Sequence, residues 1–219
     1  MLKKYLPKVA LIMLLVSILA LIILAILVHY HSVWSLDIYL SRDIQTEGDS
    51  AAKRTLILNI LTFVSFFGKT AVAGAMVVAT ATIFWLLKYY RETIFILLTP
   101  VAASINFIVK LIVDRPRPDG SLVHVLDREF DPSFPSGHVN FYVVFFGFLI
   151  ATMFMTPKIP LWIRVAVVLI SITMIISVSF SRIYLGAHWA TDVLGGYLLG
   201  SILLSILLYF YLKPLLKSK

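Results

Sequence analysis

Two histidines and an aspartate in the C-terminal half of the chain have spacings that suit phosphoryl transfer. His188 and Asp192 are four residues apart, so their side chains would face each other on a helix. A carboxylate that holds one imidazole nitrogen fixes the tautomer and leaves the other nitrogen free to attack. His138 is a second imidazole that can act as a general acid and then as a general base. These residue types together indicate covalent catalysis with histidine as the nucleophile.

Three cations accompany the histidines. Lys110, Arg117 and Arg182 have no obvious partner nearby in the sequence. A phosphate group carries two negative charges and three accepting oxygens, which suits such a cluster. The segment Ser136–His138 is expected to start a helix, where free backbone N–H groups favour an anion, and the glycine at 137 allows a close approach of the backbone. The sequence therefore predicts a phosphate-binding site.

Other interpretations of the same residues exist. His138, His188 and Asp192 could hold a zinc ion, but the three cations would repel a divalent metal, so no metal or other cofactor is expected. A His–Asp pair at this spacing can simply stabilise a helix. Arg115 and Arg164 lie at the edges of apolar runs and are interpreted as lipid-headgroup anchors. The joint occurrence of the other residues, at one depth and in one order, favours the catalytic interpretation.

The composition indicates that the natural solvent of this chain is lipid. Of its 219 residues, 60% are hydrophobic and 14% are charged, whereas soluble domains average roughly 45–50% and about 25%. The net charge of +8 is spread in short clusters between apolar runs, a pattern that fits membrane orientation and not nucleic-acid binding. The chain has no cysteine, which excludes disulfides and thiolate chemistry.

The apolar runs predict an all-α membrane protein with six transmembrane helices in one bundle, forming a single domain over residues 1–219. A helix needs about 20 apolar residues to cross a bilayer core. The six runs are Val9–Val28, Thr70–Leu87, Thr93–Val113, Val139–Met155, Trp162–Phe180 and Ala190–Leu212. Thr55–Gly68 is too short to span alone, so it is either an interfacial helix or the start of the second span.

The distribution of basic residues predicts the orientation in the membrane. With six spans, one side carries Lys3, Lys4, Lys8, Lys88, Arg91, Lys158, Arg164, Lys213, Lys217 and Lys219. The positive-inside rule places this side in the cytoplasm. Both termini are therefore expected to be cytoplasmic, and the polar site is expected at the outer face of the cell membrane.

Three motifs within residues 110–192 match a known family. They read Lys110-x6-Arg117-Pro118, Pro135-Ser136-Gly137-His138 and Ser181-Arg182-x5-His188-x3-Asp192. Together they resemble the signature of the type 2 phosphatidic acid phosphatase family, which shares its site with vanadium haloperoxidases and some bacterial acid phosphatases. The six-span form resembles the membrane lipid phosphatases of bacteria, of the phosphatidylglycerophosphatase B type.

The resemblance implies a role for each motif residue. His188 would be the nucleophile, Asp192 its orienting partner, and His138 the acid for the leaving group. The residues implied to hold the phosphate are Lys110, Arg117, Ser136, Gly137 and Arg182. The resemblance also implies that no metal is required and that vanadate inhibits.

The substrate implied by the resemblance is a phosphorylated membrane lipid. Phosphatidylglycerophosphate is expected first. Undecaprenyl diphosphate is the alternative, because the carrier is released at the outer leaflet, and a phosphotransferase that uses a second lipid as acceptor also stays open. The partners expected are therefore a phospholipid or polyprenyl phosphate and the bilayer, with no nucleic acid. The sequence leaves the oligomeric state open.

Overall fold

The computed structural model describes residues 2–46 and 50–217, and every regular element within them is a helix. The nine helices of this part of the chain are α1 (Leu2–Tyr30), α2 (Ser35–Gln45), α3 (Ala51–Phe66), α4 (Thr70–Leu86), α5 (Tyr90–Leu98), α6 (Val101–Val113), α7 (Gly137–Met155), α8 (Leu161–Tyr184) and α9 (Ala190–Lys217). The prediction of an all-α fold is confirmed.

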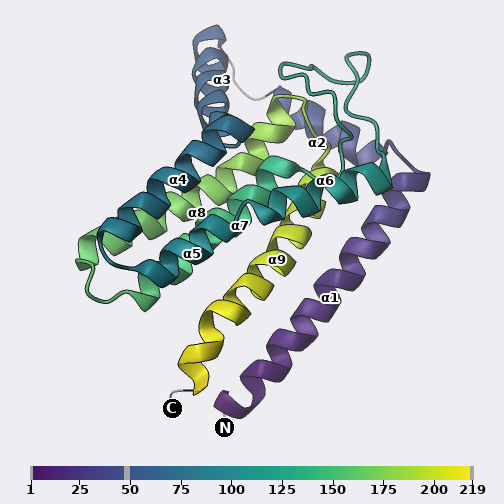
Figure 1. The fold of residues 1–219 in the computed structure, drawn as a ribbon. Helices are drawn as coiled ribbons and strands as arrows, with labels where there is room; N and C mark the ends of the chain where they lie inside the picture. Colours follow the sequence, from purple (N-terminus) through teal and green to yellow (C-terminus); the bar gives the residue numbers. More distant parts are fainter. Residues whose placement is uncertain (1, 47–49, 218–219) are drawn as a thin grey trace.

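Several helices, singly or as consecutive pairs, are long and apolar enough to cross a membrane. Five spans pass this test in the described residues: α1, α5 with α6, α7, α8 and α9. The pair α3–α4 makes a sixth span if it counts as one, although its two helices are bent by 62° at the break between them. The six-helix bundle is therefore confirmed. Thr55–Gly68 forms most of α3, which projects from the bundle in Figure 1.

The breaks between helices have local causes. Pro100 separates α5 from α6, because proline has no N–H to donate to the preceding turn. Asp114 ends α6 in the left-handed conformation with φ 47°. Pro116 and Pro118 follow at once, and each disfavours helical backbone in the residue before it. The chain from 114 to 136 is therefore a long loop without regular structure.

Helix α7 forms the centre of the bundle. Most of its side chains are buried, and its principal neighbours are α8 and α9. Two glycines let α9 approach closely: a Cβ added at Gly196 or at Gly200 would lie 2.9 or 2.8 Å from the Cβ of Val139 or Val143. Small residues of this kind allow backbones to pack at short range in membranes.

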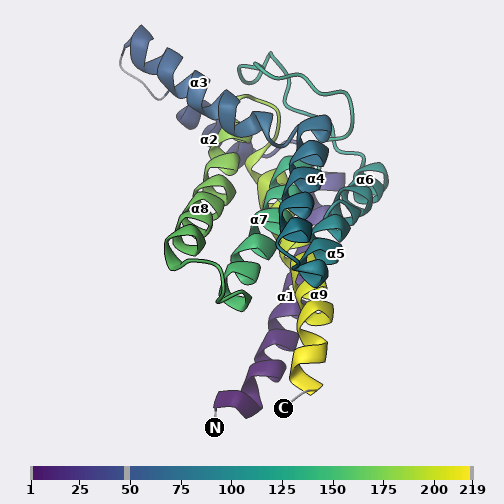
Figure 2. The same cartoon turned by 60° about the vertical axis from the view of Figure 1, so that its left-hand side comes forward.

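The polar residues gather at one end of this bundle. Helix α1 begins and α9 ends at the opposite end, while the loop 114–136 and α2 lie over the ends of α7, α8 and α9 (Figures 1 and 2). This arrangement brings the ends of α6 and α8 and the starts of α7 and α9 under a common loop. All three sequence motifs lie at these helix ends.

Candidate active site

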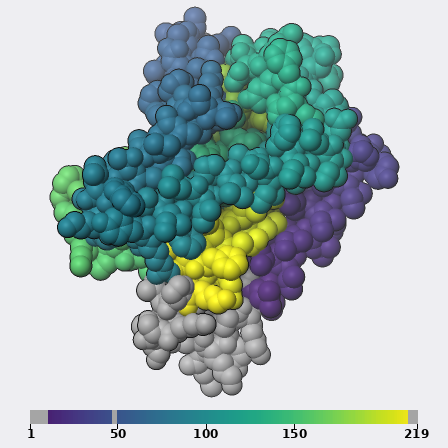
Figure 3. All heavy atoms as spheres, in the orientation of Figure 1, coloured from purple at the N-terminus to yellow at the C-terminus, as the bar shows by residue number. Residues whose placement is uncertain are grey.

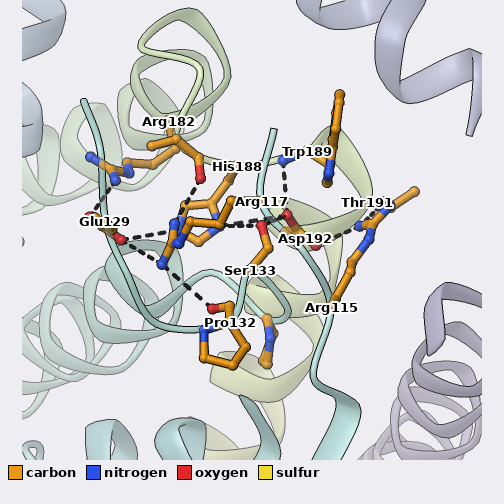
Figure 4. Close-up of polar contacts among 12 residues, drawn as sticks. Arg115, Arg117, Glu129, Pro132, Ser133, Arg182, His188, Trp189, Thr191 and Asp192 are labelled. Atoms are coloured by element: carbon orange, nitrogen blue, oxygen red, sulfur yellow. Dashed lines mark hydrogen bonds and ion pairs between the residues drawn. The ribbon is translucent and has the colours of Figure 1, made fainter. Parts of the chain in front are cut away.

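The structure brings together side chains from five different segments. Lys110 comes from α6, Arg117 from the loop, His138 from α7 and Arg182 from α8, and His188 lies two residues before α9 begins. These side chains are largely buried, and Figure 4 shows Arg117 and Arg182 close to His188. We call Lys110, Arg117 and Arg182 the cation cluster.

His188 has one ring nitrogen directed to the cation cluster. Arg117 Nη1 lies 3.2 Å from His188 Nε2. Because arginine carries only donors, this contact requires an unprotonated Nε2, and the ring proton then belongs to Nδ1. Burial, together with the charges of Arg117 and Lys110, lowers the pKa of His188 well below its usual value of 6.5. The imidazole is therefore neutral at pH 7, with a lone pair facing the cations.

Behind His188, Asp192 is the centre of a buried hydrogen-bond network. Its Oδ2 accepts from Ser133 Oγ at 2.5 Å and from the backbone N–H of Trp189 at 2.9 Å. His188 Nδ1 lies 3.6 Å from the same oxygen and 3.5 Å from Ser133 Oγ. Ser133 thus lies beside the His–Asp pair and holds its carboxylate (Figure 4).

An arginine continues this network on the other side of Asp192. Arg115 Nη1 donates to Asp192 Oδ1 at 2.5 Å, and Arg115 Nη2 donates to Asp37 Oδ2 at 2.7 Å. Asp37 comes from α2 and also accepts from the N–H and hydroxyl of Thr191. Both residues of the Arg115–Asp37 pair have fully buried side chains. A buried charge persists only when it is paired and hydrogen-bonded, and this network meets that condition.

The cation cluster is neutralised by acids of the loop. Lys110 Nζ lies 2.6 Å from Asp131 Oδ2. Arg117 pairs with Asp131 and Glu129, each at 2.7 Å. Arg182 pairs with Asp127 at 2.9 Å and with Glu129 at 2.6 Å.

The pKa of Asp131 shows how strongly the cation cluster attracts a negative charge. Burial alone would raise the pKa of Asp131, but its hydrogen bonds and the charges of Lys110 and Arg117 lower it to about 2. Asp131 is therefore ionised throughout the neutral range. A second anion, such as a phosphate ester, would meet the same attraction.

His138 is positioned by packing. A Cβ added at Gly68, in the bend between α3 and α4, would lie 2.0 Å from His138 Cδ2. The absence of a side chain at 68 is therefore what lets the imidazole lie against this bend. His138 Nδ1 is 3.9 Å from Glu129 Oε1. Ser136 Oγ, His138 Nε2 and Arg182 Nε are buried and have no hydrogen-bond partner among the described residues.

A cavity of about 770 Å³ leads from the side of the bundle to His138. Figure 3 shows this face hollowed between the α3–α4 segment and the loop. Its walls include Ala73 and Val77 of α4 and Ala103 and Phe107 of α6, and its polar end includes Lys110, Gly137, His138 and Glu129. The opening thus joins an apolar passage to Lys110 and His138.

Comparison with known proteins identifies the family. Residues 91–215, more than half of the chain, match the PAP2 superfamily. The chain belongs to the PAP2 superfamily. It is 28% identical to phosphatidylglycerophosphatase B of Bacillus subtilis over 197 residues, which cover 88% of this chain and 89% of that protein. It is also 39% identical over 71 residues to an undecaprenyl-diphosphatase of Sulfolobus acidocaldarius, covering 32% of this chain and 30% of that one.

A solved structure shows the same architecture. The transmembrane PAP2 type phosphatidylglycerolphosphate phosphatase of Bacillus subtilis superposes with a TM-score of 0.76 and 26% identity, covering 91% of this chain and 96% of that chain. The family resemblance in the three motifs is therefore confirmed, and this PAP2 chain is a phosphoric monoester hydrolase of the lipid phosphatase kind.

Two expectations about individual residues were wrong. Arg115 is not a lipid-headgroup anchor, because its exposed fraction is 1% and it pairs with two buried aspartates. The three cations have no partner among their neighbours in the sequence, but more distant acids of the loop pair with all of them. His188 and Asp192 do not share a helix, because α9 begins only at Ala190. Their side chains approach each other because Asp192 also accepts from Trp189 N–H, which folds the chain before the helix.

Proposed function

We propose that this PAP2 chain hydrolyses the terminal phosphate monoester of phosphatidylglycerophosphate. The observation that carries the proposal is the cavity whose apolar walls end at His138 and Lys110, beside the cation cluster. An acyl chain fits the apolar part, and a phosphate dianion fits the cations. The three buried polar atoms without protein partners, Ser136 Oγ, His138 Nε2 and Arg182 Nε, would gain partners from phosphate oxygens and the ester oxygen.

In the first step, His188 Nε2 would attack phosphorus in line with the lipid oxygen. The P–O bond to the lipid breaks as the P–N bond forms, and His138 donates its proton to the departing alkoxide. Lys110, Arg117 and Arg182 would spread the charge of the equatorial oxygens, which is where most of the barrier is lowered. Ser136 and the backbone of Gly137, at the N-terminus of α7, would bind the same oxygens.

In the second step, the phosphohistidine is hydrolysed. His138, now neutral, would accept a proton from water as the water attacks phosphorus, and the P–N bond breaks. His188 Nε2 is thereby returned with its lone pair, and inorganic phosphate is released. Asp192 would keep the proton on Nδ1 throughout, because its carboxylate stabilises the charge that develops on the ring.

The relatives also favour a second substrate. The match to an undecaprenyl-diphosphatase has a higher identity than the match to phosphatidylglycerophosphatase B, although over a shorter segment. Initial rates of phosphate release from purified phosphatidylglycerophosphate and undecaprenyl diphosphate, in the same detergent, test the choice. A larger kcat/KM for undecaprenyl diphosphate would overturn the proposed substrate. Equal consumption of lipid without free phosphate would indicate a phosphotransferase.

We also propose that the termini are cytoplasmic and the site faces outward. The support is the basic clustering, with Lys88, Arg91, Lys158 and Lys213 among the described residues, while the side chains of Lys3, Lys4, Lys8, Lys217 and Lys219 lie outside them. The site lies at the opposite end of the bundle from the start of α1 and the end of α9 (Figure 1). The side of the membrane on which the termini lie therefore also determines the side on which the site lies. A reporter fused after Lys219 is expected in the cytoplasm and one inserted at Gly120 outside. The reverse pattern would place the site at the inner face.

A further inference from the structure

Glu129 lies where the phosphate of a substrate would have to bind. Its Oε1 accepts from Arg182 Nη2 at 2.6 Å, and its Oε2 lies 2.7 Å from Arg117 Nη2. The same two oxygens are 3.9 Å from His138 Nδ1 and 3.8 Å from His188 Nε2. One carboxylate therefore bridges two arginines and lies next to both histidines. A phosphate dianion that reaches His188 Nε2 needs the same donors.

The neighbouring sequence explains how the loop supplies this carboxylate. Asp127, Glu129 and Asp131 alternate with Arg128 and Phe130. The three acids face the cation cluster, with which they form ion pairs, while the other two side chains face away. Arg128 is exposed, and Phe130 has an exposed fraction of 100%. We call Asp127–Asp131 the acidic segment.

Charge balance shows what the acidic segment does in the absence of substrate. The cluster carries three positive charges, and the three acids pair with all of them. Glu129 is the acid placed to compete with substrate, because it is the one that approaches both histidines. Asp127 pairs with Arg182, and Asp131 pairs with Lys110 and Arg117, so these two acids lie on either side of Glu129.

We propose that Glu129 occupies the phosphate subsite of the free enzyme and leaves when a phosphate group binds, so that it sets the affinity of this subsite for anions. The inference rests on the proposed function for the identity of the ligand. Phosphate can replace the carboxylate because it has a second charge and a third oxygen for Ser136 and the start of α7. The exchange raises the apparent dissociation constant of every anion at this subsite by the same factor. Return of Glu129 after hydrolysis would also speed the release of inorganic phosphate.

The test is direct binding of orthovanadate and of inorganic phosphate to the purified chain in detergent, by calorimetry. Glu129→Gln should bind both anions roughly tenfold tighter or more, because two charge-assisted hydrogen bonds no longer compete. Glu129→Asp keeps the charge but is one methylene too short to bridge both arginines, so it should bind tighter than the unsubstituted chain and weaker than Glu129→Gln. Asp119→Asn removes a charge from the same loop at a fully exposed site bonded to Ser121 N–H, and should change nothing.

The results separate this inference from the proposed function. Unchanged or weaker binding in Glu129→Gln would overturn the inference, even if the chain hydrolyses its lipid normally. An equal gain in Asp119→Asn would also overturn it, because general charge would then explain the effect. Tighter binding in a chain that releases no phosphate from lipid would support the inference while the proposed function fails.

A second measurement serves if Glu129→Gln does not fold. Because the chain has no cysteine, a spin label can be attached at Phe130→Cys alone, on a fully exposed side chain next to Glu129. Saturating vanadate should increase the mobility of this label, since the acidic segment leaves the cation cluster. A spectrum that does not change while calorimetry shows binding would mean that Glu129 stays in place, which contradicts the inference.

Discussion

The two histidines are held by different means. His188 is enclosed by a charged network in which Asp192, Arg115 and Asp37 follow one another without exposure to solvent. His138 lies against the backbone of Gly68 and lines an open cavity. Hydrogen bonds and ion pairs thus fix the expected nucleophile, whereas packing of a helix bend fixes the expected acid. The difference suits the chemistry, because a nucleophile needs one orientation and an acid must meet leaving groups of varied shape.

The largest effect expected is the loss of His188. Without it no phosphohistidine can form, so His188→Ala should abolish turnover with every substrate. His138→Ala should lose roughly 10²–10⁴-fold on a lipid, because an alkoxide needs a proton to leave. With p-nitrophenyl phosphate its first step should partly recover and phosphohistidine should accumulate, since the second step lacks a base. Rapid-quench trapping of acid-labile phosphoenzyme measures both variants.

This comparison can fail in a defined way. Phosphoenzyme in His188→Ala, together with none in His138→Ala, would mean that the two roles are reversed. Asp192→Asn provides an intermediate case, because the ring of His188 remains but its proton is no longer held on Nδ1. Its turnover should lie between the activities of the two histidine variants.

The second prediction concerns a variant that breaks the hydrogen-bond network behind His188. Arg115→Gln leaves Asp37 and Asp192 buried without their cation and should destabilise the chain by about 3–5 kcal/mol. Replacing Asp37 by Asn in the same chain removes one of these charges, so the double variant should be more stable than the sum of single effects. Thermal unfolding in detergent measures all of them. Arg164→Gln is the matched control.

The control is the second arginine that lies at the edge of an apolar run. Arg164 is half-buried and donates from Nε to the carbonyl of Met153, so its loss should cost no more than about 0.5–1.5 kcal/mol. Equal destabilisation by Arg115→Gln and Arg164→Gln would show that the Asp37–Arg115–Asp192 network contributes little. In that case His188 would owe its placement to other contacts.

The sequence predicted the fold, and it predicted a group of residues that the structure brings together, because both leave strong local patterns. Apolar runs of bilayer length predicted the spans, and the motifs around Lys110, His138 and His188 lie at helix ends in the structure as expected. The sequence did not decide whether Thr55–Gly68 is a separate helix or the start of the second span. No apolar or charge pattern around Gly68 indicates the angle between α3 and α4. A glycine between two apolar runs is the signal that could have indicated it.

The contacts between distant segments could not be read from the sequence. Asp37 meets Arg115 across 78 residues, and Glu129 meets Arg182 across 53. No spacing rule relates such pairs, so Arg115 was interpreted from its position at a span edge alone. The alternation of acids in Asp127–Asp131 was visible, but its target depends on how the loop crosses the bundle. Ser133 was missed for the same reason.

The third prediction concerns the packing that positions His138. Gly68→Ala places a Cβ where the imidazole lies, so the ring must move, and a displacement of about 1 Å can cost roughly 10²-fold. The first-step rate should therefore fall by about 10–100-fold on a lipid and by much less on p-nitrophenyl phosphate, which leaves without a proton. Gly74→Ala is the control: it lines the same cavity, but no atom lies within 4 Å of an added Cβ. A fall of equal size with both substrates would show a general structural defect.

The smallest effect concerns the charge of His188. Its ring should stay neutral, without a change in protonation, near neutral pH. Burial first, and then Arg117, Lys110 and Arg182, lower the pKa of His188 well below 6.5. A lowered pKa in a base means that the neutral form persists as pH falls, so Nε2 keeps its lone pair at pH 6.5, and only stronger acid removes it. Histidine labelled with ¹⁵N in detergent micelles reports this directly, with the signal of His188 identified by its loss in His188→Ala. A titration midpoint at or above 6.5 would show that the cation cluster and burial do not control this ring. The expected nucleophile would then be partly protonated near pH 6.5, and its attack on phosphorus would slow as the pH falls through that range.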